Sequence, residues 1–122
     1  MTYSPGLAAD RSGFSIDTLR YYERIGLLYD IERTSGGQRI FSDDDLEWLG
    51  VLRCLRDTGM PIATMQRYAS FARDGECTHV ERLALLREHA VEVATRIAAL
   101  RDQQQHLHDK IGWYESHLPR TA

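Results

Sequence analysis

The N-terminal quarter of the chain carries the apolar spacing and the capping residues of two short helices. Ser4 followed by Pro5 fits an N-cap and a first helical position, so we expect a short helix that Gly13 ends. Ser15 is placed to cap a second helix, which Gly26 can stop in a left-handed conformation. Two short helices joined by a tight glycine-containing turn are typical of a helix-turn-helix.

Two short alternating segments follow, on either side of a glycine pair. Residues 31–33 and 39–41 form these segments, and Gly36 and Gly37 lie between them. This arrangement predicts a β-hairpin.

Apolar positions then recur at helical spacing in two further segments. Ser42 and Asp45 fit the two halves of a capping box at the start of a third helix, which Gly59 ends. Pro61 opens a fourth helix, which residues 73–76 interrupt. The apolar positions of these two helices are Leu46, Leu49, Val51, Leu52, Leu55, Ile62, Met65, Ala69 and Ala72.

The pattern changes in the last third of the chain. Thr78 and Glu81 fit a capping box, and no proline follows until Pro119. From Leu83 to Leu118 both core positions of successive heptads are filled as in a coiled coil. Such a helix, roughly 54 Å long at about 1.5 Å per residue, needs a partner helix, so we expect a homodimer. The predicted dimer interface consists of Leu83, Leu86, Ala90, Val93, Ile97, Leu100, Gln104, Leu107, Ile111 and Tyr114.

Composition narrows the class of protein only a little. The 122 residues, 43% of them hydrophobic, suffice for one domain with an appendage and include no run that could span a membrane. No signal peptide opens the chain, so we expect a cytoplasmic protein without membrane contact. Cys54 and Cys77 are too few for a disulfide framework and are expected to be thiols. The net charge of −3 does not favour binding to nucleic acid. The placement of the basic residues therefore has to indicate whether the protein binds nucleic acid.

The second predicted helix has an outer face that core packing does not explain. At about 100° per residue, Ile16, Leu19 and Tyr22 fall on one side, and polar, aromatic and cationic residues fall on the other. Such a face suits the major groove of DNA, with the hairpin on the adjacent backbone. The alternative is a solvated face in which the charged residues merely pair with one another. The predicted DNA-binding residues are Ser15, Asp17, Thr18, Arg20, Tyr21, Arg24, Arg33, Gln38 and Arg39.

Three stretches, "TLRYYERIGLL", "RTSGGQRIFSDDDLEWL" and "LRCLRDTGMPIATM", strongly resemble the MerR family of bacterial transcription regulators. The resemblance covers the whole chain and implies a mainly α protein, with a winged helix-turn-helix domain at residues 1–76. It further implies that the helix of residues 77–122 forms an antiparallel coiled-coil dimer. A dimer of this kind binds a palindromic promoter in double-stranded DNA and twists it so that RNA polymerase can use an overlong spacer. The matching positions place Thr18, Arg20, Tyr21 and Arg24 on the recognition helix and Arg33, Gln38 and Arg39 on the wing.

Cys54 lies in the third predicted helix, at a position that is usually polar or charged in this family. Here the chain resembles the branch that responds to aldehydes, nitrosative stress and other electrophiles through a cysteine of this helix. Arg53, Arg56 and the hairpin of Arg39 would give the thiol a cationic setting, which favours the reactive thiolate. The alternative is a half-buried structural cysteine.

Three other functions remain open to the same sequence. A metal-responsive regulator would use Cys77 with histidines, but no cysteine follows Cys77, and His106 and His108 point to different helix faces. A coiled-coil adaptor would use the long helix but has no need of the polar outer face. An enzyme would need a glycine-rich phosphate loop, a zinc motif or a nucleophile motif, and none is present. We therefore expect no enzymatic activity, no metal and no cofactor.

Overall fold

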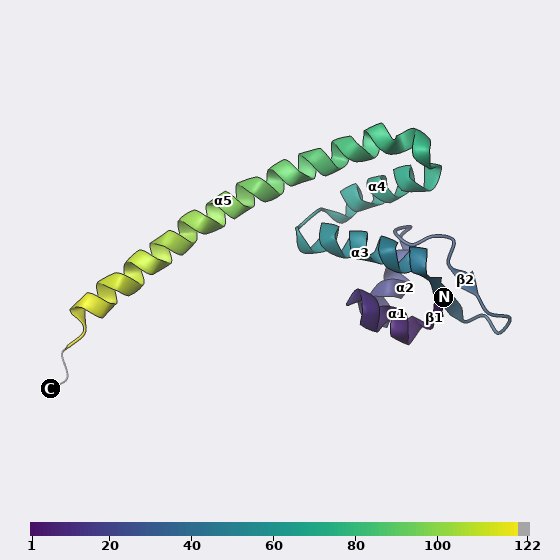
Figure 1. Cartoon of the computed structure of the whole chain (residues 1–122), viewed down its shortest axis with the longest axis horizontal. Coiled ribbons are helices and arrows are strands. Elements are labelled where there is room, and N and C mark those ends of the chain that lie inside the picture. The colour runs from purple at the N-terminus through teal and green to yellow at the C-terminus, as the bar shows by residue number, and fades with distance from the viewer. Residues whose placement is uncertain (120–122) are drawn as a thin grey trace. The chain divides into compact units, whose positions relative to one another are not determined.

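The computed structural model describes residues 1–119 (Figure 1). Contacts divide the chain into two compact units, Met1–Leu86 and the residues from Arg87 on, and each is described by itself. A domain boundary between residues 76 and 77 stays a prediction. The elements are β1 (Thr2–Tyr3), α1 (Pro5–Ser12), α2 (Ile16–Arg24), β2 (Glu32–Arg33), β3 (Arg39–Ser42), α3 (Asp43–Asp57), α4 (Ile62–Asp74), the 3-10 helix η1 (Glu76–Thr78) and α5 (His79–His117).

The capping residues explain where α1 and α2 begin and end. The Ser4 hydroxyl accepts a hydrogen bond from the backbone N–H of Leu7 at 3.2 Å, and the Ser15 hydroxyl accepts one from Thr18 at 3.0 Å. Gly13, with φ of 78°, ends α1 in the left-handed conformation. Both predicted helices of the helix-turn-helix are therefore confirmed.

The predicted hairpin forms, and a third strand joins it. β2 and β3 pair antiparallel, with Arg33 opposite Arg39. β1 pairs with the other edge of β3, placing Tyr3 opposite Phe41 and making a sheet in the order β1-β3-β2. β1 was not predicted, because a two-residue strand is too short to show an alternating pattern in the sequence.

Helices α3 and α4 largely follow their predicted patterns. The Ser42 and Asp45 side chains form both bonds of the capping box at the start of α3. In α4, Met65 and Ala69 are fully buried, whereas Ile62, in the first turn, is 38% exposed. The fold class is confirmed as mainly α, with a small sheet and a long C-terminal helix.

One hydrophobic core holds the first unit together. The Trp48 indole nitrogen donates to the Leu27 carbonyl oxygen at 2.7 Å, and the Trp48 ring stacks on Tyr68 of α4. The loop after α2 is thereby fixed to α3 and α4. The largest fully buried side chains are Phe41, Leu27, Leu49, Leu52 and Met65.

The junction between α4 and α5 differs from the predicted capping box. The Thr78 hydroxyl lies within hydrogen-bond distance of the carbonyl oxygens of Phe71 and Gly75, and it accepts a bond from the Arg82 guanidinium at 3.2 Å. Thr78 therefore closes the turn between the two helices instead of forming the predicted reciprocal cap with Glu81.

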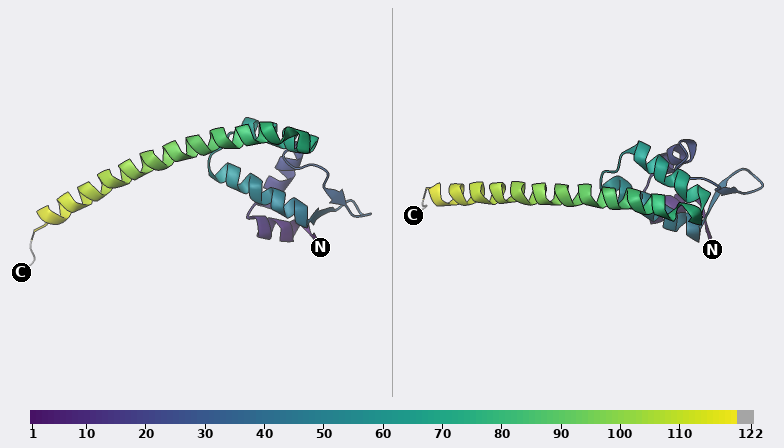
Figure 2. Two further views of the ribbon diagram at one scale, coloured as in Figure 1. Left: turned by 45° about the horizontal axis from the view of Figure 1, so that its top comes forward. Right: turned by 90° about the horizontal axis from the view of Figure 1, so that it is seen from above.

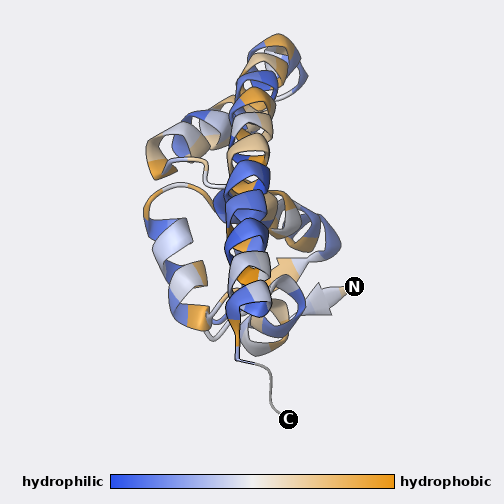
Figure 3. Ribbon diagram, turned by 90° about the vertical axis from the view of Figure 1, so that its left-hand side faces the viewer, coloured by the Kyte–Doolittle hydropathy of each residue, from blue (hydrophilic) through white to orange (hydrophobic). Residues whose placement is uncertain are grey.

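Helix α5 is one unbroken helix of 39 residues (Figure 2). At about 1.5 Å per residue it is roughly 58 Å long. Hydrophobic and hydrophilic residues succeed one another along it (Figure 3). No helix within residues 1–119 combines the length and the apolar character that are needed to span a membrane.

A side-chain contact ties β1 to the first turn of α3. The Tyr3 hydroxyl donates to the Asp43 carboxylate at 2.7 Å. This bond, together with the nearby α-amino group of Met1, holds the pKa of Asp43 below its usual range. A carboxyl whose pKa is lowered on folding stabilises the fold above its unfolded pKa of about 3.9, and loses that contribution as pH falls through the lowered value.

We predict that Tyr3→Phe lowers the melting temperature slightly at neutral pH, because the charged hydrogen bond to Asp43 is lost. The gap between wild type and variant should shrink as pH falls below about 4 and Asp43 becomes protonated. Thermal denaturation of the DNA-free protein, followed by circular dichroism over this pH range, measures the gap, with Tyr21→Phe at an exposed position of α2 as the control. A gap of constant size at every pH would contradict the assignment.

Candidate functional site

Helix α2 turns one face to the core and another to solvent. Leu19 and Tyr22 are buried as the helical spacing predicts, whereas Ile16, in the first turn, is 38% exposed. On the other side Tyr21 is 41% exposed. Arg20 and Arg24 are exposed beside it, so an aromatic and cationic face is available at the surface.

The residues of this outer face make only local contacts. Arg20 Nη1 lies 3.8 Å from Asp17 Oδ1, and both side chains are well exposed. The Arg24 guanidinium lies 5.4 Å from the centre of the Tyr21 ring. Because exposed ion pairs of this kind contribute little to stability, these side chains can exchange such contacts for a phosphate or a base edge at little cost.

The wing is tied to α2 through one shared carboxylate that sequence analysis missed. Glu23 Oε1 accepts a hydrogen bond from Arg39 Nε at 2.7 Å and another from Arg33 Nη2 at 3.2 Å. Both strands of the hairpin are thereby linked to the helix. A signal was present in the sequence: the helical spacing puts Glu23 next to Leu19 on the apolar side, where a carboxylate needs a partner.

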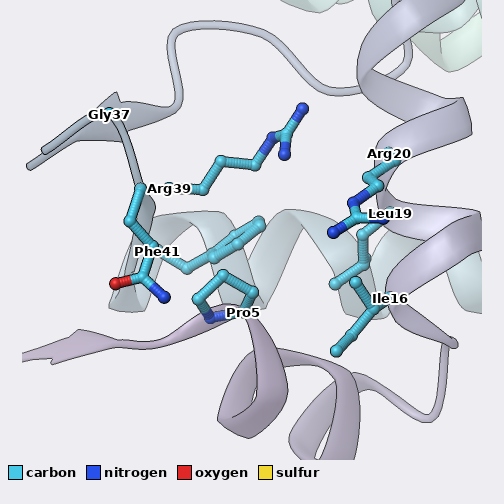
Figure 4. A pocket seen from close by; sticks show the side chains of 8 residues that line it. Pro5, Ile16, Leu19, Arg20, Gly37, Arg39 and Phe41 are labelled. Atoms are coloured by element: carbon cyan, nitrogen blue, oxygen red, sulfur yellow. The ribbon is translucent and has the colours of Figure 1, made fainter.

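A hollow of about 330 Å³ lies between α2, the wing and the start of α1. Figure 4 shows Arg20 from α2 and Arg39 from the wing on opposite sides of it. Two guanidinium groups that line one hollow give it the charge and the hydrogen-bond donors that suit an anion. The remaining lining residues are Pro5, Ile16, Leu19, Gly37, Gln38 and Phe41.

The C-terminal end of α2 is held by side chains from α4. Gln66 Nε2 donates to the Ile25 carbonyl oxygen at 3.0 Å, and Arg73 Nη2 donates to that of Gly26 at 3.3 Å. The Arg73 guanidinium also lies 4.5 Å from the centre of the Tyr29 ring. These donors satisfy carbonyl groups that a helix end and the turn after it leave free.

The surroundings of Cys54 differ from the expected cationic setting. The thiol is exposed and free on α3. However, Arg53 and Arg56 both pair with Asp57, at 2.7 and 3.1 Å, and the Arg53 hydrogen bond holds the pKa of Asp57 below its usual range. Arg39 lies before α3 begins and is paired with a carboxylate on α2. The feature that favours reaction at Cys54 is therefore its exposure.

The predicted dimer seam of α5 is exposed in the single chain. Ala90 and Gln104 are exposed, and Val93 is half-buried. A continuous row of exposed apolar side chains along one helix is unfavourable in water and is typical of a helix that pairs with another. The large apolar residues exposed in this row are Leu83, Leu86, Ile97, Leu100, Leu107, Ile111, Tyr114 and Leu118.

The residues considered as metal ligands do not gather. Cys77 is exposed in η1, with its sulfur 3.5 Å from the Asp74 carbonyl oxygen. His106 and His108 are exposed on α5. Over residues 1–119, three or more His, Cys, Asp or Glu side chains nowhere form a group that could hold a metal ion.

Known proteins resemble this chain over most of its length. The model of the MerR HTH family regulatory protein matches residues 3–71, and the model described as MerR, DNA binding, matches residues 46–110. An uncharacterized HTH-type transcriptional regulator of Haemophilus influenzae is 38% identical over 115 residues, which cover 94% of this chain and 85% of that protein. The HTH-type transcriptional regulator AdhR of Bacillus subtilis is 32% identical over 78 residues, 64% of this chain and 56% of AdhR.

A solved structure extends the similarity to the fold. HiNmlR, described as a MerR family regulator lacking the sensor domain and bound to promoter DNA, is 38% identical and has a TM-score of 0.88. The alignment covers 95% of this chain and 92% of that one. The chain therefore belongs to the MerR family and is a DNA-binding transcriptional regulator, not an enzyme.

Proposed function

We propose that this protein binds a palindromic promoter as a homodimer in the cytoplasm and distorts the DNA to control transcription by RNA polymerase. The observation that carries the proposal is the exposed, aromatic and cationic face of α2 beside the wing. The DNA-bound structure of HiNmlR supports it, because that protein is similar over nearly the whole chain.

The residues of α2 and the wing divide the contacts with DNA between them. Arg20 and Tyr21 enter the major groove, where Arg can pair with guanine and a hydroxyl can reach a base edge or a phosphate. The wing approaches the adjacent backbone. The remaining contacts come from Ser15, Asp17, Thr18 and Arg24 on the helix and from Gln38 and Arg39 on the wing, and Arg33 belongs to the same surface as part of the hairpin.

A second copy of the chain covers the seam of α5. The exposed heptad positions support this arrangement, since five heptads of apolar side chains are more than a monomer leaves in water. A palindromic site also requires two symmetric reading helices.

Cys54 supplies the signal in this proposal. Its thiol is exposed on α3, the helix that is packed through Trp48 onto the loop after α2 and onto α4. An electrophile that adds there introduces bulk within the unit that carries α2, and a small repacking of α3 changes how α2 is presented to DNA.

We predict that Arg20→Ala lowers operator affinity by about 1–3 kcal/mol and relaxes specificity, because a contact to a base edge is lost. A gel-shift titration against the DNA upstream of the protein's own gene measures both. Arg87→Ala, which removes the same charge from α5, is the control and should bind as the wild type does. Unchanged affinity and specificity in Arg20→Ala would place the DNA surface elsewhere.

We predict that Ile97→Asp with Leu100→Asp gives monomers with little specific DNA affinity, because two charges would have to be desolvated in the seam. Sedimentation at micromolar concentration measures the mass. Val91→Asp is the matched control: Val91 is 67% exposed but lies off the seam, one position after Ala90, so its variant should stay dimeric. A wild-type monomer would refute the dimer.

We predict that Cys54→Ser retains dimerisation and operator binding but abolishes induction by aldehydes or nitrosating agents, because the nucleophilic sulfur is lost. Cys77→Ser, the other exposed thiol, should respond nearly as the wild type does. A reporter assay measures induction, and mass spectrometry locates the adduct. Full induction of the Cys54 variant, or an adduct on Cys77 alone, would show that Cys54 is not the sensor.

A further inference from the structure

Glu23 holds two wing arginines with one oxygen atom, although it lies on the helix proposed to enter DNA. We propose that Glu23 is a positioning residue that gives the two wing arginines different roles. It orients Arg39 toward a backbone phosphate of DNA, and it holds Arg33 in place so that Arg33 stabilises the hairpin. The inference rests on the proposal that α2 and the wing form the DNA-binding surface.

Arg33 is engaged within the protein at both of its terminal nitrogens. Nη2 donates to Glu23 Oε1 at 3.2 Å, and Nη1 donates to the Gly37 carbonyl oxygen at 3.0 Å. The same turn is closed by backbone bonds from Thr34 to Gln38 at 2.7 Å and from Gly37 to Thr34 at 2.9 Å. The Arg33 guanidinium thus links the turn of the wing to α2, and a phosphate would have to displace one of these bonds.

Arg39 is held in a different way. Its Nε donates to Glu23 at 2.7 Å, which is shorter than either side-chain bond of Arg33, and its side chain is only 25% exposed. A bond at Nε fixes the plane of the guanidinium and leaves the two Nη atoms as a fork for a bidentate phosphate contact. Arg39 lines the hollow opposite Arg20 (Figure 4), so the fork is held at a site with a second positive charge.

Considered by its charge alone, Glu23 should weaken DNA binding, which is the opposite of what the positioning role predicts. A carboxylate beside DNA is repelled by the phosphates, so an acid without a positioning role should weaken binding, and its removal should strengthen it. An acid that orients Arg39 should favour binding in spite of its charge, because a guanidinium already held in place loses less conformational freedom on contact. The sign of the effect of Glu23→Gln therefore separates the two roles.

The first test compares Glu23→Gln with Glu32→Gln in a titration of operator DNA. Glu32 is an exposed acid on the same hairpin, so its variant removes the same charge from the wing. We expect Glu23→Gln to weaken binding about tenfold through the lost charge-assisted bonds. Glu32→Gln should bind as the wild type does or slightly more tightly. Equal or tighter binding by Glu23→Gln overturns the proposal.

The second test uses the salt dependence of binding, which a merely structural role does not change. Arg39→Ala should lower the slope of log K against log salt by about one, as expected when one phosphate contact is lost. Arg33→Ala should leave the slope unchanged even where it weakens binding. In the Arg39→Ala background, Glu23→Gln should cost much less than in the wild type, because the side chain that it orients is absent and only its bond to Arg33 is left to lose.

The outcomes separate this proposal from the one on which it rests. Normal binding by both Arg20→Ala and Arg39→Ala overturns the DNA-binding surface itself. A loss with Arg39→Ala, but an equal cost of Glu23→Gln in both backgrounds, leaves the surface standing and overturns the positioning role. If a thermal melt shows that Glu23→Gln does not fold, the salt slopes of Arg33→Ala and Arg39→Ala still test the proposal. A slope for Arg33→Ala that is lower than that of the wild type overturns the different roles of the two arginines.

Discussion

The proposed contact with DNA depends on holding a short helix, α2, with its polar face outward. A helix of nine residues is not stable in water by itself, so its orientation has to come from its surroundings. Leu19 and Tyr22 anchor its inner side in the core, Ser15 caps its start, and Gln66 reaches its end from α4. Because these ordering contacts lie on the inner side and at the ends, the outer face stays available for the proposed contact with DNA.

The same constraint explains the small sheet and the helices around it. The wing is bound to α2 by ion pairs with Glu23, and β3 is also joined to β1 on its other edge. Helix α3 starts directly at the end of β3, and its Trp48 holds the loop that follows α2. A displacement of α3 or α4 therefore has to carry α2 with it or break these bonds, and the proposed signal at Cys54 relies on this coupling.

Charge placement matters more here than total charge. The chain has a net charge of −3, yet Arg20 and Arg39 line one hollow on the surface proposed to meet DNA. The arginines near Cys54 are paired with Asp57 as Arg39 is with Glu23, but their terminal nitrogens are engaged as well: Arg53 Nη1 donates to the Ser12 carbonyl oxygen and Arg56 Nη2 to Asp57. The availability of an arginine to a ligand thus depends on which of its nitrogens the protein already binds.

The sequence by itself determined the elements whose signals are local: the caps at Ser4, Ser15 and Ser42, the hairpin, and the heptads of α5. It also carried the resemblance to the MerR family, because the matching residues lie in continuous stretches. Only the tertiary structure decided which distant side chains meet. The pairing of β1 with β3, the bonds from Glu23 to two arginines, the closing of the α4–α5 turn by Thr78 and the pairing of Asp57 near Cys54 all depend on how folded elements approach one another. Helical period and capping rules describe neighbours along the chain, whereas ion pairs and hydrogen bonds between elements are selected by packing geometry.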